Sequence, residues 1–600
     1  MSTLLAIIIL SGLFSMLDAS SSDAAPAVIE ELFINFVREY IELSPETGTQ
    51  LGLSGQYGFD VRNDELDDMS IAGYDKLYQF YRKYRTWLAQ YDRQKLTSSQ
   101  RIASDVLTWY LDDAIRGEQF RYHQYIINPM LSFHNQLTTL LTEHHKIEKL
   151  QDAKDYIQRL MQYDKMVSEL LEQLLIREQK GIVPPIYIIE IFQQAIDDFI
   201  RVPYSENILF TSFVNRIQSL TTIDEESKEK LSQQVLKALE NVVYPSYRRM
   251  SEYVGSLKGK TDIKAGVWQL PNGADYYSYC LRHHTTTTMT PEEIHTLGLR
   301  EVKRIQDEIT QHLKTLGISG SDKFSDLIAE YRIMTGDVND IRFYYPFTEE
   351  GKLQTLRAYQ VIIDTMQSKL TTMFSLIPRT QVRVERLPKF KEATMGTYYQ
   401  PPKLDGSSDG IFYAQLSYQH FKPGMKALAY HEAIPGHHFQ IALERESPDS
   451  RLFKALFFFT GYTEGWALYA EKLAKEYGYY DDTHSLIGYL SSELLRAIRL
   501  VVDTGIHWKK WTSEEAYYYI VRNYGRTWYS QIVRYIVWPG QACAYKVGEL
   551  KIVQLREKAR QALGERFDIK DFHSVILQHG SVPLEILEQL VDDYIKTARE

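Results

Sequence analysis

Apolar residues recur every three to four positions through most of the first 380 residues, which is the spacing of amphipathic helices. Val28–Leu43 follows this pattern and ends at Ser44-Pro45. Asp152–Lys180 follows it over a longer span, and the clearest breaks come at Pro184-Pro185 and Pro271-Asn272-Gly273. We predict one helix over Asp152–Lys180, with an apolar face formed by Leu160, Met161, Met166, Leu170, Leu171, Leu174 and Leu175. The pattern predicts a mainly α protein.

A different pattern occupies residues 381–418. The stretches VRVERL, GTYYQ and GIFYAQLSY are β-branched or aromatic and are separated by Pro, Gly, Asp and Ser, which is typical of short strands. We therefore expect a small β-sheet here. Helical periodicity resumes at Lys422, with helices expected over residues 426–445, 451–477, 485–507 and 513–530. The pair His283-His284, followed by four threonines, is interpreted as a loop.

The chain contains no internal repeat and no low-complexity linker, so we predict a single unit of two helical lobes around a deep cleft. Residues 25–280 would form the first lobe, and residues 281–600 would form the second. Tyrosine is abundant, at 43 of 600 residues, which suits either cleft walls or half-buried helix positions.

Charge and cysteine content exclude several classes of protein. With 68 basic and 78 acidic residues and no long basic run, the chain lacks the clustered positive face that binding to nucleic acid requires. Two cysteines, Cys280 and Cys543, are too few for a four-cysteine zinc site or a disulfide framework. A single bridge between them remains open, although two free thiols are favoured.

An apolar run at residues 4–17 precedes the small and polar stretch DASSSDAAPA. Fourteen helical residues span about 21 Å, less than the bilayer core of about 30 Å, so residues 1–24 are interpreted as a secretory signal peptide. An uncleaved anchor is the alternative, because no Lys or Arg precedes the run. No cysteine follows it, which argues against a lipoprotein anchor. We expect a secreted or periplasmic protein without stable membrane association after cleavage.

The candidate chemistry begins directly after the predicted sheet, at Tyr430-His431-Glu432-Ala433-Ile434-Pro435-Gly436-His437-His438-Phe439-Gln440. A zinc peptidase helix ordinarily reads His-Glu-x-x-His, which puts both histidines on one face and the glutamate near a bound water. Here the fourth position after His431 is Pro435, whose ring clashes with the His431 carbonyl and interrupts the helix.

Two arrangements would restore a pair of histidine ligands. His438 would return to the face of His431 in a regular helix, but a rise of about 10.5 Å would separate them, which is too far to share an ion. A bulge of two extra residues at Pro435-Gly436 would instead bring His437 into place. We favour His437 as the ligand, and His438 would then line the substrate cleft.

A third ligand is expected from a later helix, because catalytic zinc usually takes three protein side chains. Glu464 follows His437 by 27 residues, which leaves room for the motif helix to end and the chain to return antiparallel. Glu471, two turns further on, and Gln440 are expected to orient the ligands from behind. The alternative is that the histidines form a polar helix terminus and the acids a solvated face.

With these residues the chain resembles the domain of unknown function 885 family, a group with the features of zinc metallopeptidases. The resemblance covers most of the chain and rests on five stretches: Ser44–Gly52, Thr290–Leu299, His431–Gln440, Arg496–His507 and Tyr535–Gly548. The family is similar in layout to thimet oligopeptidase, angiotensin-converting enzyme and thermostable carboxypeptidases, which have two helical lobes around a channel. Dipeptidyl peptidase three, with one extra residue between its histidines, shows that the motif can stretch.

The resemblance implies hydrolysis of short peptides. His431, His437 and Glu464 would hold Zn²⁺, and Glu432 would act as general base and later protonate the departing amine. Tyr545, with Tyr535 as second choice, would donate a hydrogen bond to the oxyanion, as a late tyrosine does in helical oligopeptidases. Tyr430, Tyr413 and Tyr462 are expected to be cleft walls.

Four basic residues are candidates for holding the C-terminal carboxylate of a peptide: Arg534, Lys546, Arg496 and Arg499. Ion pairs with acids such as Asp503 are the alternative for each of them. The GIFYAQLSY strand would offer backbone groups to an extended peptide. Two other functions stay open, a zinc amidohydrolase acting on a non-peptide amide and a peptide-binding protein without catalysis. The sequence leaves the oligomeric state undetermined.

Overall fold

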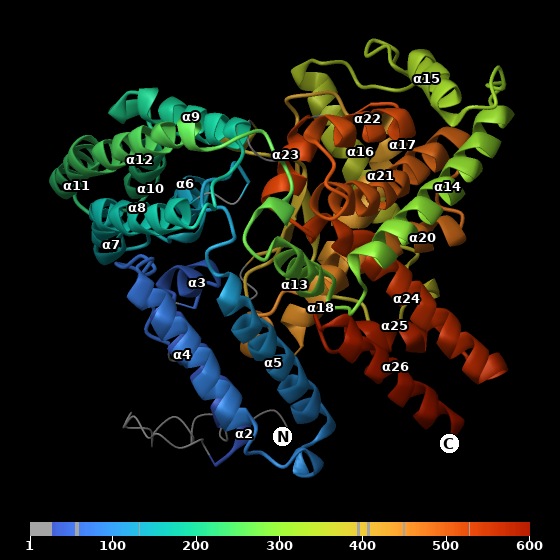
Figure 1. The fold of residues 1–600 in the computed structure, drawn as a ribbon, viewed down its shortest axis with the longest axis horizontal. Coiled ribbons are helices and arrows are strands. Elements are labelled where there is room, and N and C mark those ends of the chain that lie inside the picture. Colours follow the sequence, from blue (N-terminus) through green and yellow to red (C-terminus); the bar gives the residue numbers. More distant parts are fainter. Residues whose placement is uncertain are drawn as a thin grey trace.

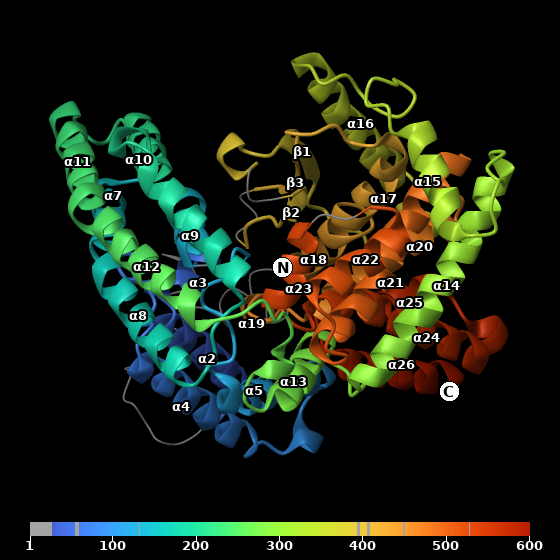
Figure 2. The same ribbon diagram turned by 45° about the horizontal axis from the view of Figure 1, so that its top comes forward.

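The computed structural model describes residues 27–53, 59–130, 133–392, 396–404, 408–447, 451–526 and 529–600. The predicted signal peptide lies outside the described residues. The described chain is mainly helical with one small sheet (Figures 1 and 2), which confirms the predicted class.

A smaller hydrophobic core lies in the helical bundle drawn at the left of Figures 1 and 2, with apolar residues from Leu66 to Leu257. Its helices are α6 (Phe133–Thr139), α7 (Leu150–Met161), α8 (Tyr163–Gln179), α9 (Ile186–Arg201), α10 (Ile208–Gln218), α11 (Glu225–Ala238) and α12 (Tyr244–Ser256).

A larger core joins helices from both ends of the chain. Before the small bundle come α2 (Ile29–Leu43), α3 (Pro45–Gln50), α4 (Ile71–Leu88) and α5 (Ser98–Gly117). After it come α13 (Gly273–Thr285), α14 (Pro291–Thr315), α15 (Phe324–Thr335), α16 (Glu349–Gln367), α17 (Lys422–Glu432), α18 (His437–Glu446), α19 (Arg451–Lys454), α20 (Thr460–Glu476), α21 (Thr483–His507), α22 (Ser513–Tyr524), α23 (Tyr529–Val537), α24 (Gln541–Leu563), α25 (Ile569–Leu577) and α26 (Leu584–Arg599).

The division between the two cores differs from the predicted lobes of 25–280 and 281–600. Helices α2, α4 and α5 pack in the larger core, where the Phe33 and Phe453 rings lie 4.6 Å apart. Trp109 Nε1 in α5 donates to Glu585 Oε2 in α26 over 3.3 Å. Periodicity marks the apolar face of a helix, but it does not identify the partner that covers this face.

The predicted helix over Asp152–Lys180 is two helices, α7 and α8, separated at Gln162. The Gln162 amide is turned to a distant loop, donating to Asp64 O over 2.5 Å and accepting from Leu66 N over 3.1 Å. Met161 is consequently 50% exposed rather than buried. Similar interruptions divide residues 451–477 into α19 and α20, and residues 513–530 into α22 and α23.

The predicted loop at His283-His284 is also wrong, because both histidines belong to α13. His283 Nδ1 lies 2.7 Å from Asp113 Oδ2 in α5, so a contact across helices holds the end of α13. Cys280, in the same helix, and Cys543 are free and buried, which confirms the favoured thiol prediction.

Capping residues set the start of the two long helices that support the site. Thr290 Oγ1 accepts from Glu293 N, Glu293 Oε2 accepts from Thr290 N over 2.8 Å, and Pro291 takes the first helical position of α14. Asp482 caps α21 by accepting from Ser485 N over 2.9 Å. Helix α21 packs between α14 and α17, so its side chains can reach the motif helix.

The small sheet predicted between residues 381 and 418 is confirmed. It has the strand order β1 (Val382–Arg386), β3 (Gly410–Ala414), β2 (Tyr398–Gln400). Strand β1 runs parallel to β3, with Val382 opposite Gly410, and β2 runs antiparallel to β3, with Tyr399 opposite Phe412. The sheet precedes α17, as expected, and β2 lies against the motif.

Helices α20 and α24 cross with their backbones almost in contact, because glycines occupy the crossing point. A Cβ at Gly548 would lie 1.9 Å from the carbonyl oxygen of Gly461 and 2.8 Å from Cα of Gly465. No side chain fits there. The crossing brings the segments around Glu464 and Tyr545 together.

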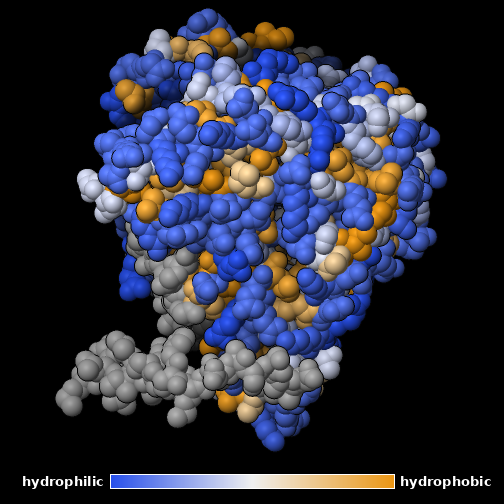
Figure 3. Space-filling model, turned by 90° about the vertical axis from the view of Figure 1, so that its left-hand side faces the viewer, coloured by the Kyte–Doolittle hydropathy of each residue, from blue (hydrophilic) through white to orange (hydrophobic). Residues whose placement is uncertain are grey.

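The face shown in Figure 3, turned to the left in Figure 1, is mostly hydrophilic, with apolar residues scattered among polar ones. This distribution is typical of amphipathic helices whose polar sides face water. Among the described residues, none of the helices combines the length and apolar character needed to cross a bilayer.

Candidate metal centre

The motif helix is broken at the predicted place, but into two helices rather than a bulged one. Helix α17 ends at Glu432, the Ile434–Pro435 peptide is cis, and α18 begins at His437. Pro435 has no N–H to continue the helical ladder. The next residue is Gly436, and only glycine fits there, because a Cβ would lie 1.9 Å from the carbonyl oxygen of His431. The chain therefore turns back tightly enough to place His437 against His431.

His431, His437 and Glu464 form a cluster in which the potential ligand atoms all lie within 4.8 Å of one another. Glu464 Oε2 is 3.4 Å from Nε2 of each histidine. The two imidazole rings lie 4.8 Å apart between centroids and are nearly perpendicular, at 81°. The side chains of His437 and Glu464 retain 12% and 14% exposure, so solvent reaches the cluster.

Glu471 holds His431 from behind. Its Oε1 lies 2.8 Å from Nδ1 of His431, and its Oε2 accepts from Ser492 Oγ over 2.8 Å. Burial alone would lower the pKa of His431, but the neighbouring Glu464 and Glu471 carboxylates outweigh it and raise the pKa to about 9. The carboxylates therefore favour positive charge at this ring.

The pKa of Glu464 likewise indicates that the cluster favours a charged carboxylate beside charged imidazoles. Burial would raise its pKa, yet His437 and His431 hold it well below the ordinary value. Glu464 Oε2 and His437 Nδ1 are buried atoms without a hydrogen-bond partner among the described residues. Two imidazoles and a carboxylate with open donor positions suit Zn²⁺, so the residues fit the predicted ion.

Glu432 extends from the last turn of α17 toward the sheet. Its Oε2 accepts from the backbone N–H of Tyr399 in β2 over 3.1 Å. Burial raises its pKa above the ordinary value, against the opposing effect of His431 and His437. This is the direction that a proton acceptor working near neutral pH requires.

A wall of aromatic and basic side chains faces the cluster from α21, α23 and α24. The Tyr545 ring stacks parallel to the His431 ring at 6.5 Å, and its hydroxyl accepts from Arg534 Nη2 over 3.2 Å. Arg499, only 6% exposed, lies over the same tyrosine ring at 4.7 Å. Tyr535 is fully buried and donates to Gln531 Oε1 over 3.3 Å.

Other predicted residues do not join the cluster. His438 is buried, with Nδ1 3.0 Å from Tyr399 Oη and Nε2 3.1 Å from Thr380 O, so it fastens α18 to the sheet region. Burial lowers its pKa to about 4. Gln440 donates to Glu444 over 2.8 Å rather than to a histidine. Tyr430 and Tyr462 are core residues rather than cleft walls, while Tyr413 is half-buried on β3.

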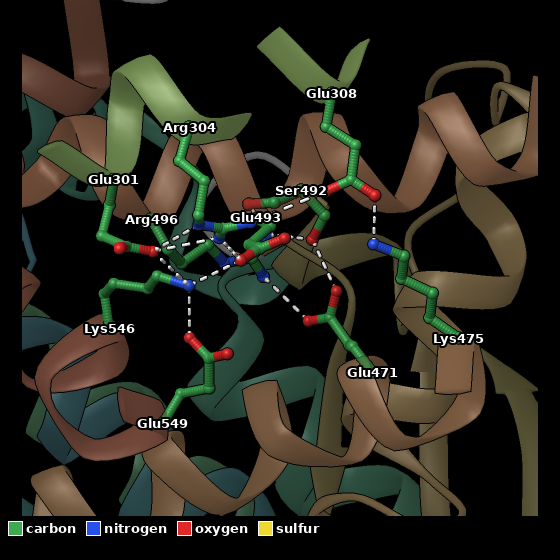
Figure 4. Close-up of polar contacts among 10 residues, drawn as sticks. All are labelled: Glu301, Arg304, Glu308, Glu471, Lys475, Ser492, Glu493, Arg496, Lys546 and Glu549. Atoms are coloured by element: carbon green, nitrogen blue, oxygen red, sulfur yellow. Dashed lines mark hydrogen bonds and ion pairs between the residues drawn. The ribbon is translucent and has the colours of Figure 1, made fainter. Parts of the chain in front are cut away.

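Lys546 and Arg496 belong to a buried polar network that runs behind Glu471 (Figure 4). The Lys546 ammonium is fully buried and lies 2.7 Å from Glu493 and 3.6 Å from Glu301, with Glu549 as a third partner. These carboxylates raise its pKa despite burial. Lys546 is therefore paired with buried acids rather than placed to hold a substrate carboxylate. Arg496 contacts Ser492 and lies 3.9 Å from Glu471. Asp503 accepts hydrogen bonds from Tyr277 Oη and Gly540 N, and no arginine of the described chain pairs with it.

Sequence reasoning missed Ser492 and the backbone of Tyr399, which contact Glu471 and Glu432. Ser492 is one of many serines and stands in no motif, and a backbone N–H has no residue-type signal.

Fold and site together define a mainly helical protein with a candidate His-His-Glu cation centre. The chain belongs to the family described as "Bacterial protein of unknown function (DUF885)", whose model matches residues 45–591.

Two solved structures are similar to the chain. The "putative lipoprotein from Colwellia psychrerythraea" has 28% sequence identity and a TM-score of 0.86, covering 94% of this chain and 99% of its own. A "putative lipoprotein of unknown function from Shewanella oneidensis" has 17% identity and a TM-score of 0.72, covering 94% and 100%, and this likeness concerns the fold alone. No curated protein matches the chain.

Proposed function

We propose that this protein is a zinc-dependent peptidase that hydrolyses short peptides, with Glu432 as general base. The observation that carries the proposal is the cluster of His431, His437 and Glu464, whose potential ligand atoms lie within 4.8 Å of one another, next to the half-buried Glu432. Glu471 supports it, because a carboxylate behind a ligand histidine fixes the tautomer and orientation of the ring.

Each residue has a defined task in this proposal. Zinc bound by His431, His437 and Glu464 would polarise the scissile carbonyl and lower the pKa of a water molecule. Glu432 takes the proton of the attacking water and passes it to the amine nitrogen that leaves. Tyr545 directs its hydroxyl proton to the developing oxyanion, because Arg534 already donates to its oxygen.

We extend the proposal to an exported protein, secreted or periplasmic. The support is twofold: the apolar run at residues 4–17 has the length of a signal peptide, and the similar structure at 28% identity is described as a putative lipoprotein.

The test combines metal analysis with digestion of a peptide library. We expect about one zinc ion per chain, cleavage of short peptides, and loss of cleavage in Glu432→Gln with zinc retained. Glu350→Gln, an exposed substitution on α16, is the matched control and should change neither. Metal-free protein from zinc-supplemented growth, or cleavage that persists in Glu432→Gln, would contradict the proposal. Hydrolysis of non-peptide amides but not of peptides would favour an amidohydrolase instead.

A further inference from the structure

A cavity of about 370 Å³ lies between α15, α17, α21 and α22, beside the motif helix. Gly424 and Leu428 of α17 form one side of it, and Ser491 and Arg496 of α21 form another. We call it the arginine cavity, after Arg332, Arg496 and Arg526, which all line it.

The charged residues that line the arginine cavity are all basic. None of the described residues that line it is an aspartate or a glutamate. Nε of Arg332 and Nε of Arg496 are buried atoms without a hydrogen-bond partner among the described residues. Burial, together with the nearby Arg526 guanidinium, lowers the pKa of Arg332 against the opposing effect of Tyr524. An anion would relieve both the repulsion and the missing hydrogen bonds.

Existing contacts hold the two arginines in place: among the described residues Arg496 pairs with the Glu471 carboxylate, whereas Arg332 has no acidic partner. Arg332 Nη2 donates to the carbonyl oxygen of Tyr524 over 2.5 Å, and its guanidinium lies over the Tyr524 ring at 4.9 Å. Arg496 Nη1 donates to Ser492 O over 3.2 Å, while its Nη2 lies 3.9 Å from the carboxylate of Glu471. Donors fixed in advance bind an anion at a lower entropic cost.

The arginine cavity adjoins the candidate metal centre, because its lining residue Ser492 donates to Glu471, the carboxylate that contacts His431. Helices α17 and α21 are packed closely side by side, since a Cβ at Gly488 would lie 2.1 Å from Pro423 O. Glu432 follows Leu428, which lines the cavity, by one helical turn of α17. Eight helical residues from Gly424 to Glu432 span about 12 Å, the length of about three extended peptide residues.

We propose that the arginine cavity binds the C-terminal carboxylate of a peptide whose scissile bond lies at Glu432. This inference rests on the proposed peptidase function and narrows it to substrates with a free C-terminus, cleaved a few residues from that end. Planar guanidinium groups match a carboxylate with paired hydrogen bonds, which a neutral C-terminal amide cannot accept in the same way.

The test measures binding separately from cleavage. Full-length Glu432→Gln protein is titrated by calorimetry with acetyl-tetraalanine as the free acid and as its C-terminal amide. The acid should bind at least about tenfold more tightly than the amide. Arg332→Gln should abolish this preference, Arg332→Lys should keep part of it, and Arg357→Gln, an exposed arginine paired with Glu350, should leave it unchanged. Inorganic phosphate should compete with the acid only weakly.

Equal binding of acid and amide overturns the inference, as does an unchanged preference in folded Arg332→Gln protein or phosphate binding that exceeds binding of the acid. Failures of the two proposals are distinguishable. A preference for the acid without any peptide hydrolysis supports the arginine cavity and rejects the peptidase. Equal hydrolysis of peptides that end in a free acid or in an amide supports the peptidase and rejects the arginine cavity as a carboxylate site.

Discussion

Nδ1 of His431 lies 2.8 Å from Oε1 of Glu471, while Nε2 of the same ring faces Glu464 at 3.4 Å. One helix, α20, thus supplies both carboxylates, seven residues apart and on one face. The outer carboxylate fixes the ring so that its other nitrogen points to the cation position.

Replacing Glu471 by Gln should weaken zinc binding by about 10-fold to 100-fold, because a neutral amide supports the ligand histidine less strongly. Competition with a coloured chelator measures the affinity. Glu476→Gln is the matched control on the same helix. Glu476 Oε2 accepts from Arg556 Nη1 over 2.7 Å and takes no part in the cluster. Equal affinity in the two variants would show that Glu471 has no role in metal binding.

Substitutions of the two adjacent histidines, His437 and His438, should have different effects. His437→Ala should lose zinc, whereas His438→Ala should keep it and instead lose stability, about 1–3 kcal/mol, as Tyr399 and Thr380 lose a buried partner. Metal content and urea unfolding of the metal-free proteins measure the two effects. Zinc loss confined to His438→Ala would reverse the assignment.

The position of the helix break could be predicted from Pro435, but its form could not. Sequence spacing indicated that two extra residues must be accommodated, and it favoured His437 over His438. The tight reversal depends on Gly436 approaching the His431 carbonyl, a backbone contact that residue types do not encode. Lys546 shows the same limit, because its three acidic partners come from α14, α21 and α24, whose packing the sequence does not specify.

Tyr545→Phe should lower kcat by about 100-fold to 1000-fold while zinc stays bound, if its hydroxyl serves the oxyanion. Tyr535→Phe is the control, because its hydroxyl proton is already donated to Gln531 and its ring is fully buried. We expect a change of only a few fold in that variant. Steady-state kinetics with a peptide substrate measure kcat of both variants. Equal losses of kcat would show that Tyr545 has no special role at the oxyanion.

Asp503 should make stability fall as pH rises from about 4 to about 7. Burial raises its pKa from 3.8 to about 7, so over this range the folded protein keeps a proton that the unfolded chain has released. The contribution of Asp503 to the free energy of unfolding is on the order of 4 kcal/mol. It is present below about pH 4 and lost above about pH 7. Asp503→Asn should lack this decline relative to the parent, measured as melting temperatures of metal-free protein. Parallel pH profiles would contradict it.

Lys546→Met should destabilise the fold by about 3–5 kcal/mol, because Glu301, Glu493 and Glu549 would stay buried without their cation. Lys475→Met, at the half-buried edge of the same network, should cost less, about 1 kcal/mol. Denaturant unfolding compares the two variants. Similar losses would mean that burial does not govern the strength of this network.

The glycine crossing of α20 and α24 gives the site its dimensions. Glu464 lies one residue before Gly465, and Tyr545 lies one turn before Gly548, so main-chain contact sets how far the carboxylate is from the phenol. Neighbouring side chains can diverge without altering that span. A single methyl group at Gly548 would force the helices apart and open the ligand-to-phenol gap, although both functional side chains would still be present.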